Sequence, residues 1–421
     1  MKKYILPVLL SIFLLSDIRI AAQTIYRTGV FDANIKTLRT LVADEPFGLP
    51  VIELNSNDVL EISFDEMSHE ARAYSYRVFH CNADWTVSDR LTSNDYLSGY
   101  TTASITDYAL SENTVYLYTN YLFRLPNDDM RFKISGNYVV QLFEDNRTDA
   151  PVAQVCFSVV EPKVTVSGRV RGNTDTELNN RLQQLDFDVE LKSYRVPDVN
   201  NEIKVVVRQN NRIDNQVTDI KPTYFSSEKL NYVNNRKLIF KGGYEYHRFD
   251  ISSIYNAAEG VDRIRYNHTQ YEAYLYPKFV NKSRVYSFEP DVNGKFVVHL
   301  QNAYSDVNLS ADYLQVHFSL KTDEPFFDGE VYLGGEFNYN IMDDNSLMKY
   351  DFNSGEYFKT VLLKQGGYNY QYWFLPKNSA IADVERVDGS FWQTDNEYSI
   401  YVYHRPWGAP YDKLIGFGNI K

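Results

Sequence analysis

Apolar and polar residues alternate with a period of two along most of this chain. Between residues 113 and 125, one face would carry Val115, Leu117, Thr119, Tyr121 and Phe123, and the other Tyr116, Tyr118, Asn120 and Leu122. The same alternation recurs at residues 58–64, 74–79, 137–143, 203–208, 295–300, 368–374 and 398–403. This period is typical of β-strands with one buried face and one partly solvated face.

Turn sequences separate these segments. They are Ser135-Gly136-Asn137, Gly242-Gly243, Asn293-Gly294, Ser354-Gly355 and Gly366-Gly367. Only residues 177–185 have a briefly helical pattern. Tyr (35) and Phe (25) bring the aromatic content to 15%, which favours strands over helices. The pattern therefore predicts an all-β protein built from immunoglobulin-like β-sandwiches.

Prolines and changes of rhythm indicate the domain boundaries. A predicted strand ends before Pro162, and a second break falls at Pro325. With 421 residues, the chain is long enough for two to four domains. We therefore predict three tandem domains, at residues 23–162, 163–325 and 326–421, joined by short connectors into a stiff rod or arc.

The first residues predict export from the cytoplasm. Lys2 and Lys3 precede an apolar run at residues 4–15, and small residues up to Ala22 offer a cleavage point. The run is shorter than the roughly 20 residues that span a bilayer. We expect a signal peptide at residues 1–22 and a soluble mature chain without an anchor. Its formal net charge of -12 argues against nucleic acid as a partner.

The segment FHCNADW at residues 79–85 is the strongest candidate for chemistry. In a strand, His80 points away from its neighbour Cys81, so the two cannot form a nucleophile–base pair. Zinc needs about four ligands, and the chain has no CxxC, HxH or HExxH spacing. Cys81 is therefore predicted to be structural.

Two alternatives remain open within this segment. Cys81 and Cys156 both fall in the first predicted domain, so they either form a disulfide in an oxidising compartment or remain separate thiols. Sequence does not determine the distance that a disulfide requires. Trp85 is interpreted as a core residue, with a partner contact as the alternative.

Other chemical patterns are incomplete. Residues 351–355 (DFNSG) lack the spacing of a calcium-binding loop, and no helix follows the Gly416-Phe417-Gly418 run to receive a phosphate. No nucleophile elbow or Walker loop occurs. We expect no catalytic residues, no cofactor and no bound metal.

Several motifs resemble one known family. They are YRVFHCNADW at 76–85, YLSGY at 96–100, SENTVYLYTNYLFRLPND at 111–128, SGNYVVQLFED at 135–145, QNNRIDN at 209–215, KPTYF at 221–225, FKGGYEYHRFD at 240–250 and DVNGKF at 291–296. In this order they resemble the type IX secretion system Plug protein family over about residues 27–300. The chain departs from the family pattern at residues 244–247, where Tyr-Glu-Tyr-His stands in place of Asn-Glu-Phe-Arg.

The resemblance implies a periplasmic protein that is not an enzyme. Such a protein binds an outer-membrane translocon barrel and closes its periplasmic opening. Trp85, Arg248 and Trp407 are the candidate partner contacts, because Trp and Arg are common anchors of protein interfaces.

A carbohydrate-binding protein is the alternative. Residues 331–340, 362–376 and 394–408 are similar to the immunoglobulin-like modules that bind glycogen and starch beside amylase domains. Sugar binding would need exposed aromatic platforms, for which Tyr339, Trp373, Trp392 and Trp407 are the candidates. If these rings fill the sandwich instead, the fold is shared without the sugar site.

Overall fold

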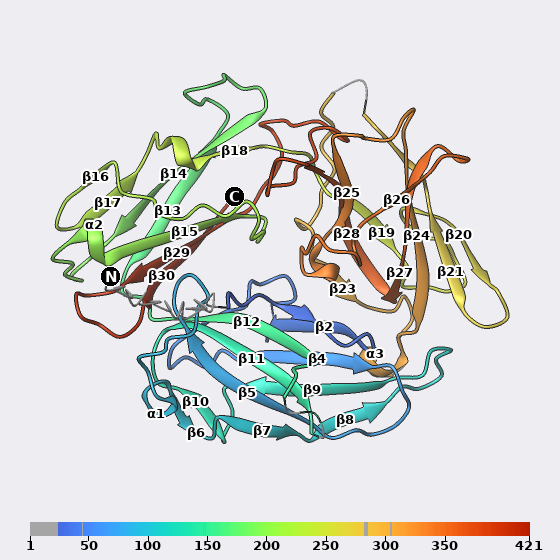
Figure 1. Cartoon of the computed structure of the whole chain (residues 1–421), viewed down its shortest axis with the longest axis horizontal. Helices are drawn as coiled ribbons and strands as arrows, with labels where there is room; N and C mark the ends of the chain where they lie inside the picture. The colour runs from blue at the N-terminus through green and yellow to red at the C-terminus, as the bar shows by residue number, and fades with distance from the viewer. Residues whose placement is uncertain (1–23, 44, 146, 148, 282–284, 304) are drawn as a thin grey trace, which may run out of the picture.

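The computed structural model describes residues 24–43, 45–145, 147, 149–281, 285–303 and 305–421. The predicted signal peptide lies outside these residues. Among them strands predominate and the helices are short, which confirms the all-β prediction. Figure 1 shows three lobes around a common centre. Lobe 1 is formed by residues between 24 and 160, lobe 2 by residues 164–241 with 398–420, and lobe 3 by residues 247–387.

Lobe 1 is a pair of β-sheets around an aromatic core. One sheet contains, in order, β1 (Gly29–Val30), β12 (Ala153–Val160), β11 (Gly136–Glu144), β5 (Tyr74–Cys81) and β7 (Thr102–Ile105), with β3 (Val51–Glu53) beside β12. The other contains β2 (Ile35–Val42), β4 (Leu60–Glu66), β9 (Thr119–Leu125) and β8 (Asp107–Leu110). A small ladder of β6 (Leu97–Gly99) and β10 (Met130–Phe132) follows helix α1 (Ser93–Tyr96). Tyr138 of β11 stacks on Phe157 between the sheets.

Lobe 2 combines segments from the middle and the end of the chain. Its first sheet contains β13 (Thr165–Arg171), β14 (Leu182–Glu190), β17 (Lys229–Tyr232) and β16 (Tyr224–Phe225), with β18 (Ile239–Lys241) beside β14. Its second sheet contains β15 (Ile203–Gln209), β29 (Tyr398–His404) and β30 (Lys413–Ile420). The helices are α2 (Val199–Glu202) and the 3-10 helix η1 (Arg236–Leu238). Val205 lies opposite Val402 in the register of the second sheet.

Lobe 3 is inserted between β18 and β29 of lobe 2. One of its sheets contains β19 (His247–Asp250), β28 (Gly366–Pro376), β23 (Phe296–Val298) and, beside β28, β25 (Gly329–Gly334). The other contains β20 (Val261–Tyr266), β21 (Tyr271–Leu275), β24 (Tyr313–Lys321), β27 (Glu356–Lys364), β26 (Lys349–Asp351) and, beside β24, β22 (Lys278–Phe279). The helices are α3 (Val307–Ser310) and the 3-10 helix η2 (Glu336–Asn338).

The expected domain boundary at residue 325 is wrong. β24 and β27 lie on either side of it and pair along their full length, from Tyr313 opposite Lys364 to Lys321 opposite Glu356. The strands β29 and β30, expected in a C-terminal domain, complete lobe 2 instead. Each lobe contacts both others, so the expected rod or arc is also wrong (Figure 1). The local hydrophobic period does not show which distant strands pair, so the sequence pattern could not predict this topology.

Candidate functional site

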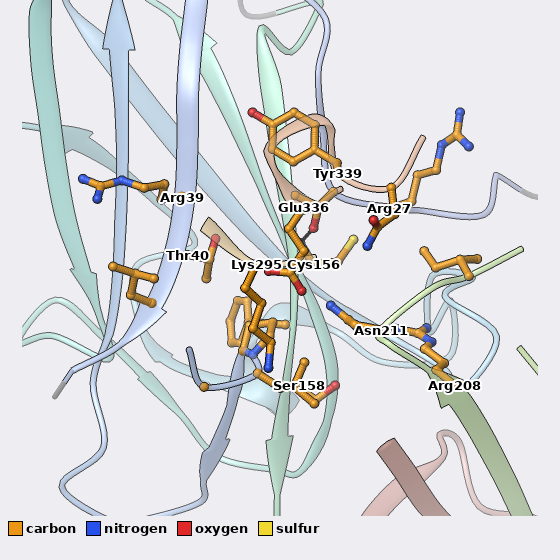
Figure 2. Close-up of a pocket in the computed structure, with 18 of the residues that line it drawn as sticks. Arg27, Arg39, Thr40, Cys156, Ser158, Arg208, Asn211, Lys295, Glu336 and Tyr339 are labelled. Atoms are coloured by element: carbon orange, nitrogen blue, oxygen red, sulfur yellow. Dashed lines mark hydrogen bonds between the residues drawn. The ribbon is translucent and has the colours of Figure 1, made fainter. Parts of the chain in front are cut away.

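A cavity of about 150 Å³ lies where the three lobes meet. Lobe 1 contributes Thr40, Trp85 and Cys156, lobe 2 contributes Arg208, Asn211 and Tyr401, and lobe 3 contributes Lys295, Glu336 and Tyr339. Figure 2 shows Thr40 and Lys295 on one side of the cavity and Arg208 and Asn211 on the other. The lining residues Arg27, Phe47 and Ile213 are exposed, which marks the side on which the cavity reaches solvent. The sequence pattern did not predict this site, because its charged residues come from separate lobes.

A buried ion pair joins lobe 1 to lobe 3. Lys364 Nζ lies 2.6 Å from Asp65 Oδ2, and each side chain is 1% exposed. The Tyr313 hydroxyl donates to the same carboxylate oxygen at 2.6 Å and lies 2.6 Å from Thr37 Oγ1. Burial lowers the pKa of Lys364, and the neighbouring Asp65 opposes that effect. Because the charges are paired and hydrogen-bonded, they are tolerated in the interior.

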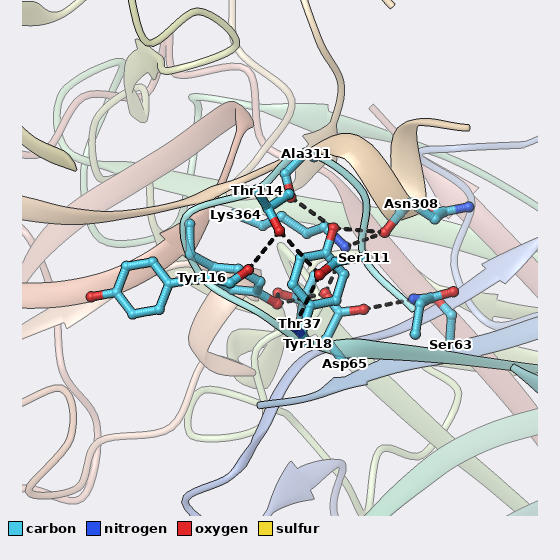
Figure 3. A network of polar contacts seen from close by, with 12 residues as sticks. Thr37, Ser63, Asp65, Ser111, Thr114, Tyr116, Tyr118, Asn308, Ala311 and Lys364 are labelled. Carbon is cyan, nitrogen blue, oxygen red and sulfur yellow. Dashed lines mark hydrogen bonds and ion pairs between the residues drawn. The ribbon is translucent and has the colours of Figure 1, made fainter. Parts of the chain in front are cut away.

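The backbone around this pair is also bonded across the junction (Figure 3). The Tyr118 hydroxyl lies 3.0 Å from the carbonyl oxygen of Asn308 and 2.8 Å from that of Ala311, and the two oxygens share its one proton. Asp312 accepts hydrogen bonds from the backbone N–H groups of Val115 (2.7 Å) and Tyr116 (3.0 Å). The strand expected from residue 113 begins only at Thr119, and the backbone N–H groups of Val115 and Tyr116 bond to Asp312 of lobe 3 in place of a strand partner.

The FHCNADW segment forms the junction between lobes 1 and 2. Its Ala83 N–H donates to Asp412 Oδ2 at 3.0 Å, and Lys204 Nζ of lobe 2 donates to the same oxygen at 3.0 Å. Asp412 is 1% exposed. At the same junction, the Tyr403 hydroxyl donates to Asn137 Oδ1 at 2.9 Å. The segment therefore serves as a turn that holds two lobes together.

The two cysteines of lobe 1 are free. Strand β11 separates them: Cys81 lies opposite Asn137 on one side, and Cys156 lies opposite Val139 on the other. Two strand spacings amount to about 9.5 Å, beyond the roughly 6.8 Å that a disulfide allows between Cα atoms. The disulfide alternative is therefore wrong. Burial raises the pKa of both thiols, that of Cys156 to about 12.

His80 makes contacts separate from those of Cys81. Its ring lies against Tyr138 and Tyr411, with centroids 5.0 and 5.2 Å away, and its Nδ1 is 2.8 Å from Ser88 Oγ. Burial lowers its pKa to about 4, so the ring is neutral near pH 7. Cys81 instead packs against Trp85 and Val139. The prediction that adjacent strand residues point apart holds here.

The three candidate partner contacts differ in exposure. Trp85 is only 8% exposed and packs beside Cys81, so a partner could not reach it without rearrangement, and the core interpretation is correct. The Arg248 side chain is 35% exposed and lies 2.6 Å from Glu259. Trp407 is 95% exposed. Of the three, Trp407 offers the largest free surface.

Trp407 lies in a loop that other residues hold in place. Its backbone N–H donates to Glu202 Oε1 at 3.2 Å. The Arg90 guanidinium of lobe 1 donates to the carbonyl oxygens of Gly408 and Ala409, each at 3.2 Å. The exposed indole therefore projects from an ordered loop at the edge of the junction between lobes 1 and 2.

The aromatic platform expected for sugar binding is not formed by its candidate residues. Trp373 is fully buried, donates from Nε1 to Gln371 Oε1 at 3.0 Å and lies under the Arg212 guanidinium at 4.1 Å. Tyr339 packs against the core of lobe 1. The Trp392 ring is partly buried against Gly172. Of the four candidates, only Trp407 is exposed, so coplanar exposed rings are not available among them.

The segment in which the chain departs from the family pattern, residues 244–247, is buried. Tyr244, Glu245, Tyr246 and His247 are each at most 9% exposed. Glu245 Oε1 accepts hydrogen bonds from the Tyr286 hydroxyl (2.5 Å) and the Asp395 N–H (3.2 Å). Burial raises the pKa of Glu245 to about 7. These residues therefore lie inside the connection between lobes 2 and 3.

The fold and its junctions define an all-β protein whose three sandwich lobes are locked together by buried polar contacts. Residues 35–161 match the family model described as the type 9 secretion system plug protein 1st domain. A hypothetical protein from Parabacteroides merdae, known from its crystal structure, is 40% identical, with a TM-score of 0.92. The match covers 94% of this chain and 99% of that chain. The chain belongs to the same family as that protein, and its first lobe resembles the first domain of the plug proteins of type IX secretion.

The comparison with curated proteins finds no match. Within the part of the chain that the structure describes, no helix is long and apolar enough to cross a membrane. In the same residues, no three His, Cys, Asp or Glu side chains are grouped so that they could hold a metal ion.

Proposed function

We propose that this protein is a periplasmic plug that binds the outer-membrane translocon barrel of the type IX secretion system and occludes its periplasmic opening. The observation that carries the proposal is the match of residues 35–161 to the first domain of plug proteins. In this proposal the protein acts by binding, without catalysis.

The arrangement of the lobes supports an occluding role. Lobe 1 is bonded to lobe 3 through the buried pair Asp65 and Lys364, and to lobe 2 through Asp412. Lobes 2 and 3 are joined by Lys295 and Glu397 at 3.1 Å, with both side chains nearly buried. Because each lobe is bonded to the other two, the protein should resist deformation better than a chain of flexibly linked domains does. Such a body could block an opening without being pushed apart.

Trp407 is the proposed anchor of the contact with the barrel. Exposed Trp side chains are over-represented among residues that dominate binding energy, and here the ring projects from a loop fixed by Arg90 and Glu202. Stable interfaces bury roughly 1,200–2,000 Å² in total. The contact is therefore expected to extend from Trp407 across the junction of lobes 1 and 2.

Purification of the barrel from cells that carry or lack this chain tests the proposal. With the chain present, it should copurify with the barrel in a specific complex. Without it, the barrel should remain assembled but open, so that cells admit large solutes that they normally exclude. An unchanged permeability barrier in the deletion strain, together with a barrel that purifies without this chain from unperturbed cells, would refute the plug assignment.

A further inference from the structure

Strand β8 is a free edge of lobe 1. Among the described residues, it pairs with β9 on one side and with no strand on the other. Figure 1 shows β8 at the outer border of lobe 1, near β7. The Ser111 N–H donates to the Tyr118 carbonyl oxygen at 2.9 Å, and bonded and non-bonded pairs alternate along an antiparallel ladder. Tyr108 and Leu110 therefore turn their backbone N–H and C=O groups outward, away from β9.

The sequence of β8 does little to prevent pairing at this edge. Charged side chains, prolines and bulges usually protect the edge strands of natural proteins. In lobe 3, the edge strand β20 has Asp262, Arg263 and Arg265. The four residues of β8 (DYAL) include one charge, at Asp107, and the register with β9 runs without a bulge. The outward backbone groups of β8 are therefore open to a further strand.

Exposed apolar side chains lie on β8 and in the segment that follows it. Tyr108 is 47% exposed and Leu110 is 40% exposed. Val115 and Leu117, in the segment that leads to β9, are exposed as well. This segment is held on lobe 3, because the Val115 N–H donates to Asp312 Oδ2 at 2.7 Å. A strand added to β8 would therefore meet apolar side chains that are already ordered.

The neighbouring edge strand β7 offers backbone groups without apolar side chains. It pairs only with β5 among the described residues. The Val78 N–H donates to the Thr101 carbonyl oxygen at 3.0 Å, so by the same alternation Thr102 and Ser104 turn their backbone groups outward. Both of these side chains are small and polar. The two edges therefore differ in side chains more than in backbone, which makes β7 the natural control.

The geometry of β8 defines the kind of partner that fits it. A row of outward N–H and C=O groups at strand spacing is matched by another extended backbone. Four residues span about 13 Å, which suits a short segment. A stable dimer buries roughly 1,200–2,000 Å², more than this short edge offers to a second copy of the chain.

We propose that β8 binds an extended segment of another polypeptide, which adds a strand to the sheet β2-β4-β9-β8 and places apolar side chains at alternate positions against Tyr108 and Leu110. Main-chain hydrogen bonds then supply affinity, and the apolar contacts supply selectivity. The surface lies where lobes 1 and 3 meet, whereas Trp407 lies where lobes 1 and 2 meet. The inference therefore does not depend on the proposed function.

The test uses the full mature chain and a capped peptide that copies residues 119–125 (TNYLFRL). This sequence already pairs with the inner side of β8 and has apolar residues at alternate positions. Titration calorimetry should show saturable binding. The same peptide with an N-methylated backbone cannot donate hydrogen bonds and should bind at least about tenfold more weakly. Hydrogen exchange should show protection of residues 107–110 when the unmethylated peptide is added.

Variants show which edge the peptide uses. Leu110→Pro removes one outward N–H and leaves the ladder with β9 in place, so it should weaken binding by about tenfold or more. Ser104→Pro makes the same change on β7 and should leave binding unchanged. Tyr108→Lys adds a charge to the edge and should also weaken binding, which keeps the proposal testable if Leu110→Pro does not fold.

Four outcomes would overturn the proposal. The first is that the unmethylated peptide shows no saturable binding. The second is that Tyr108→Lys and the folded Leu110→Pro variant bind it as tightly as the unaltered protein does. The third is that Ser104→Pro weakens binding as much as Leu110→Pro does. The fourth is that sedimentation shows a dimer of the unaltered protein that Tyr108→Lys dissociates, which would assign β8 to a second copy of the chain.

Discussion

Asp65 and Lys364 form an ion pair in the interior, although 299 residues separate them in the sequence. Their charged atoms are 2.6 Å apart, and neither side chain is more than 1% exposed. Asp65 comes from β4 of lobe 1 and Lys364 from the end of β27 in lobe 3. The pair therefore makes the stability of one lobe depend on the presence of the other.

Loss of one member of this pair should be strongly destabilising. Asp65→Asn leaves Lys364 as an uncompensated buried charge, so we expect the free energy of unfolding to fall by about 3–5 kcal/mol. The double variant Asp65→Asn, Lys364→Met should recover part of this loss. Urea denaturation measures both effects. As a control, Glu61→Gln breaks an exposed pair with Arg124 within lobe 1 and should cost less than about 1 kcal/mol. Equal costs at the two sites would contradict the assignment of a buried junction.

Glu245 should make stability depend on pH near neutrality. Its pKa rises from 4.5 to about 7 in the folded chain, so between these values the folded state holds a proton that the unfolded state has lost. Stability should therefore fall as pH rises through this window. Glu245→Gln keeps an acceptor for the Tyr286 hydroxyl and removes the charge, and it should be more stable than the unaltered protein by about 1–3 kcal/mol at pH 8. At pH 4.5 the gain should vanish.

Denaturation curves across this pH range provide the measurement for Glu245. The exposed Glu228 offers a control, since Glu228→Gln should leave the pH profile unchanged. A constant difference between Glu245→Gln and the unaltered protein at all pH values would mean that ionisation of this carboxyl is not the cause.

Cys81 should react slowly with thiol reagents until the protein unfolds. The residue is fully buried, and burial raises the pKa of its thiol, so little thiolate is available. Cys81→Ala should cost on the order of 1 kcal/mol and leave partner binding intact. Labelling with Ellman's reagent in native buffer and in urea tests the reactivity. Rapid labelling of Cys81 in native buffer, or stoichiometric zinc that this substitution removes, would show that the structural role is wrong.

The amide hydrogens of strands β29 and β30 should exchange with solvent together with those of the rest of lobe 2. Val205 of β15 lies opposite Val402 of β29, so opening this sheet exposes both strands together. Hydrogen exchange followed by mass spectrometry should show peptides from 203–209 and 398–404 losing protection at the same denaturant concentration. Peptides from 366–376 in lobe 3 serve as the comparison. If peptides from 398–404 instead followed those of 366–376, the described topology would be contradicted.

Trp407 should matter for binding and not for folding. Because the ring is 95% exposed, Trp407→Ala should change stability by less than about 0.5 kcal/mol. Affinity for the translocon barrel should fall by about tenfold or more, as for an interface anchor. Phe352→Ala is the control, since Phe352 is 79% exposed but lies in lobe 3. If Trp407→Ala bound the purified barrel with unchanged affinity, the indole would not be an anchor.

Part of the site could be predicted from local sequence. A structural role for Cys81 was predicted from the absence of ligand spacing and from the geometry of a strand, which turns His80 away, and the structure shows Cys81 buried. Trp85 was correctly interpreted as a core residue. The state of the thiols could not be predicted, because it depends on the strand that lies between Cys81 and Cys156. The central cavity could not be predicted either, because its lining residues come from all three lobes.

The sequence by itself determined that this protein is all-β and that its first part resembles the plug proteins of type IX secretion. Both conclusions rest on local information, namely a period of two and short ordered motifs. Only the tertiary structure decided that lobe 3 is inserted into lobe 2, that Asp65 meets Lys364 and that a cavity forms at the centre. These features depend on pairing between residues distant in the chain. The alternating pattern of a strand does not specify which other strand it pairs with, so the pattern could not predict them.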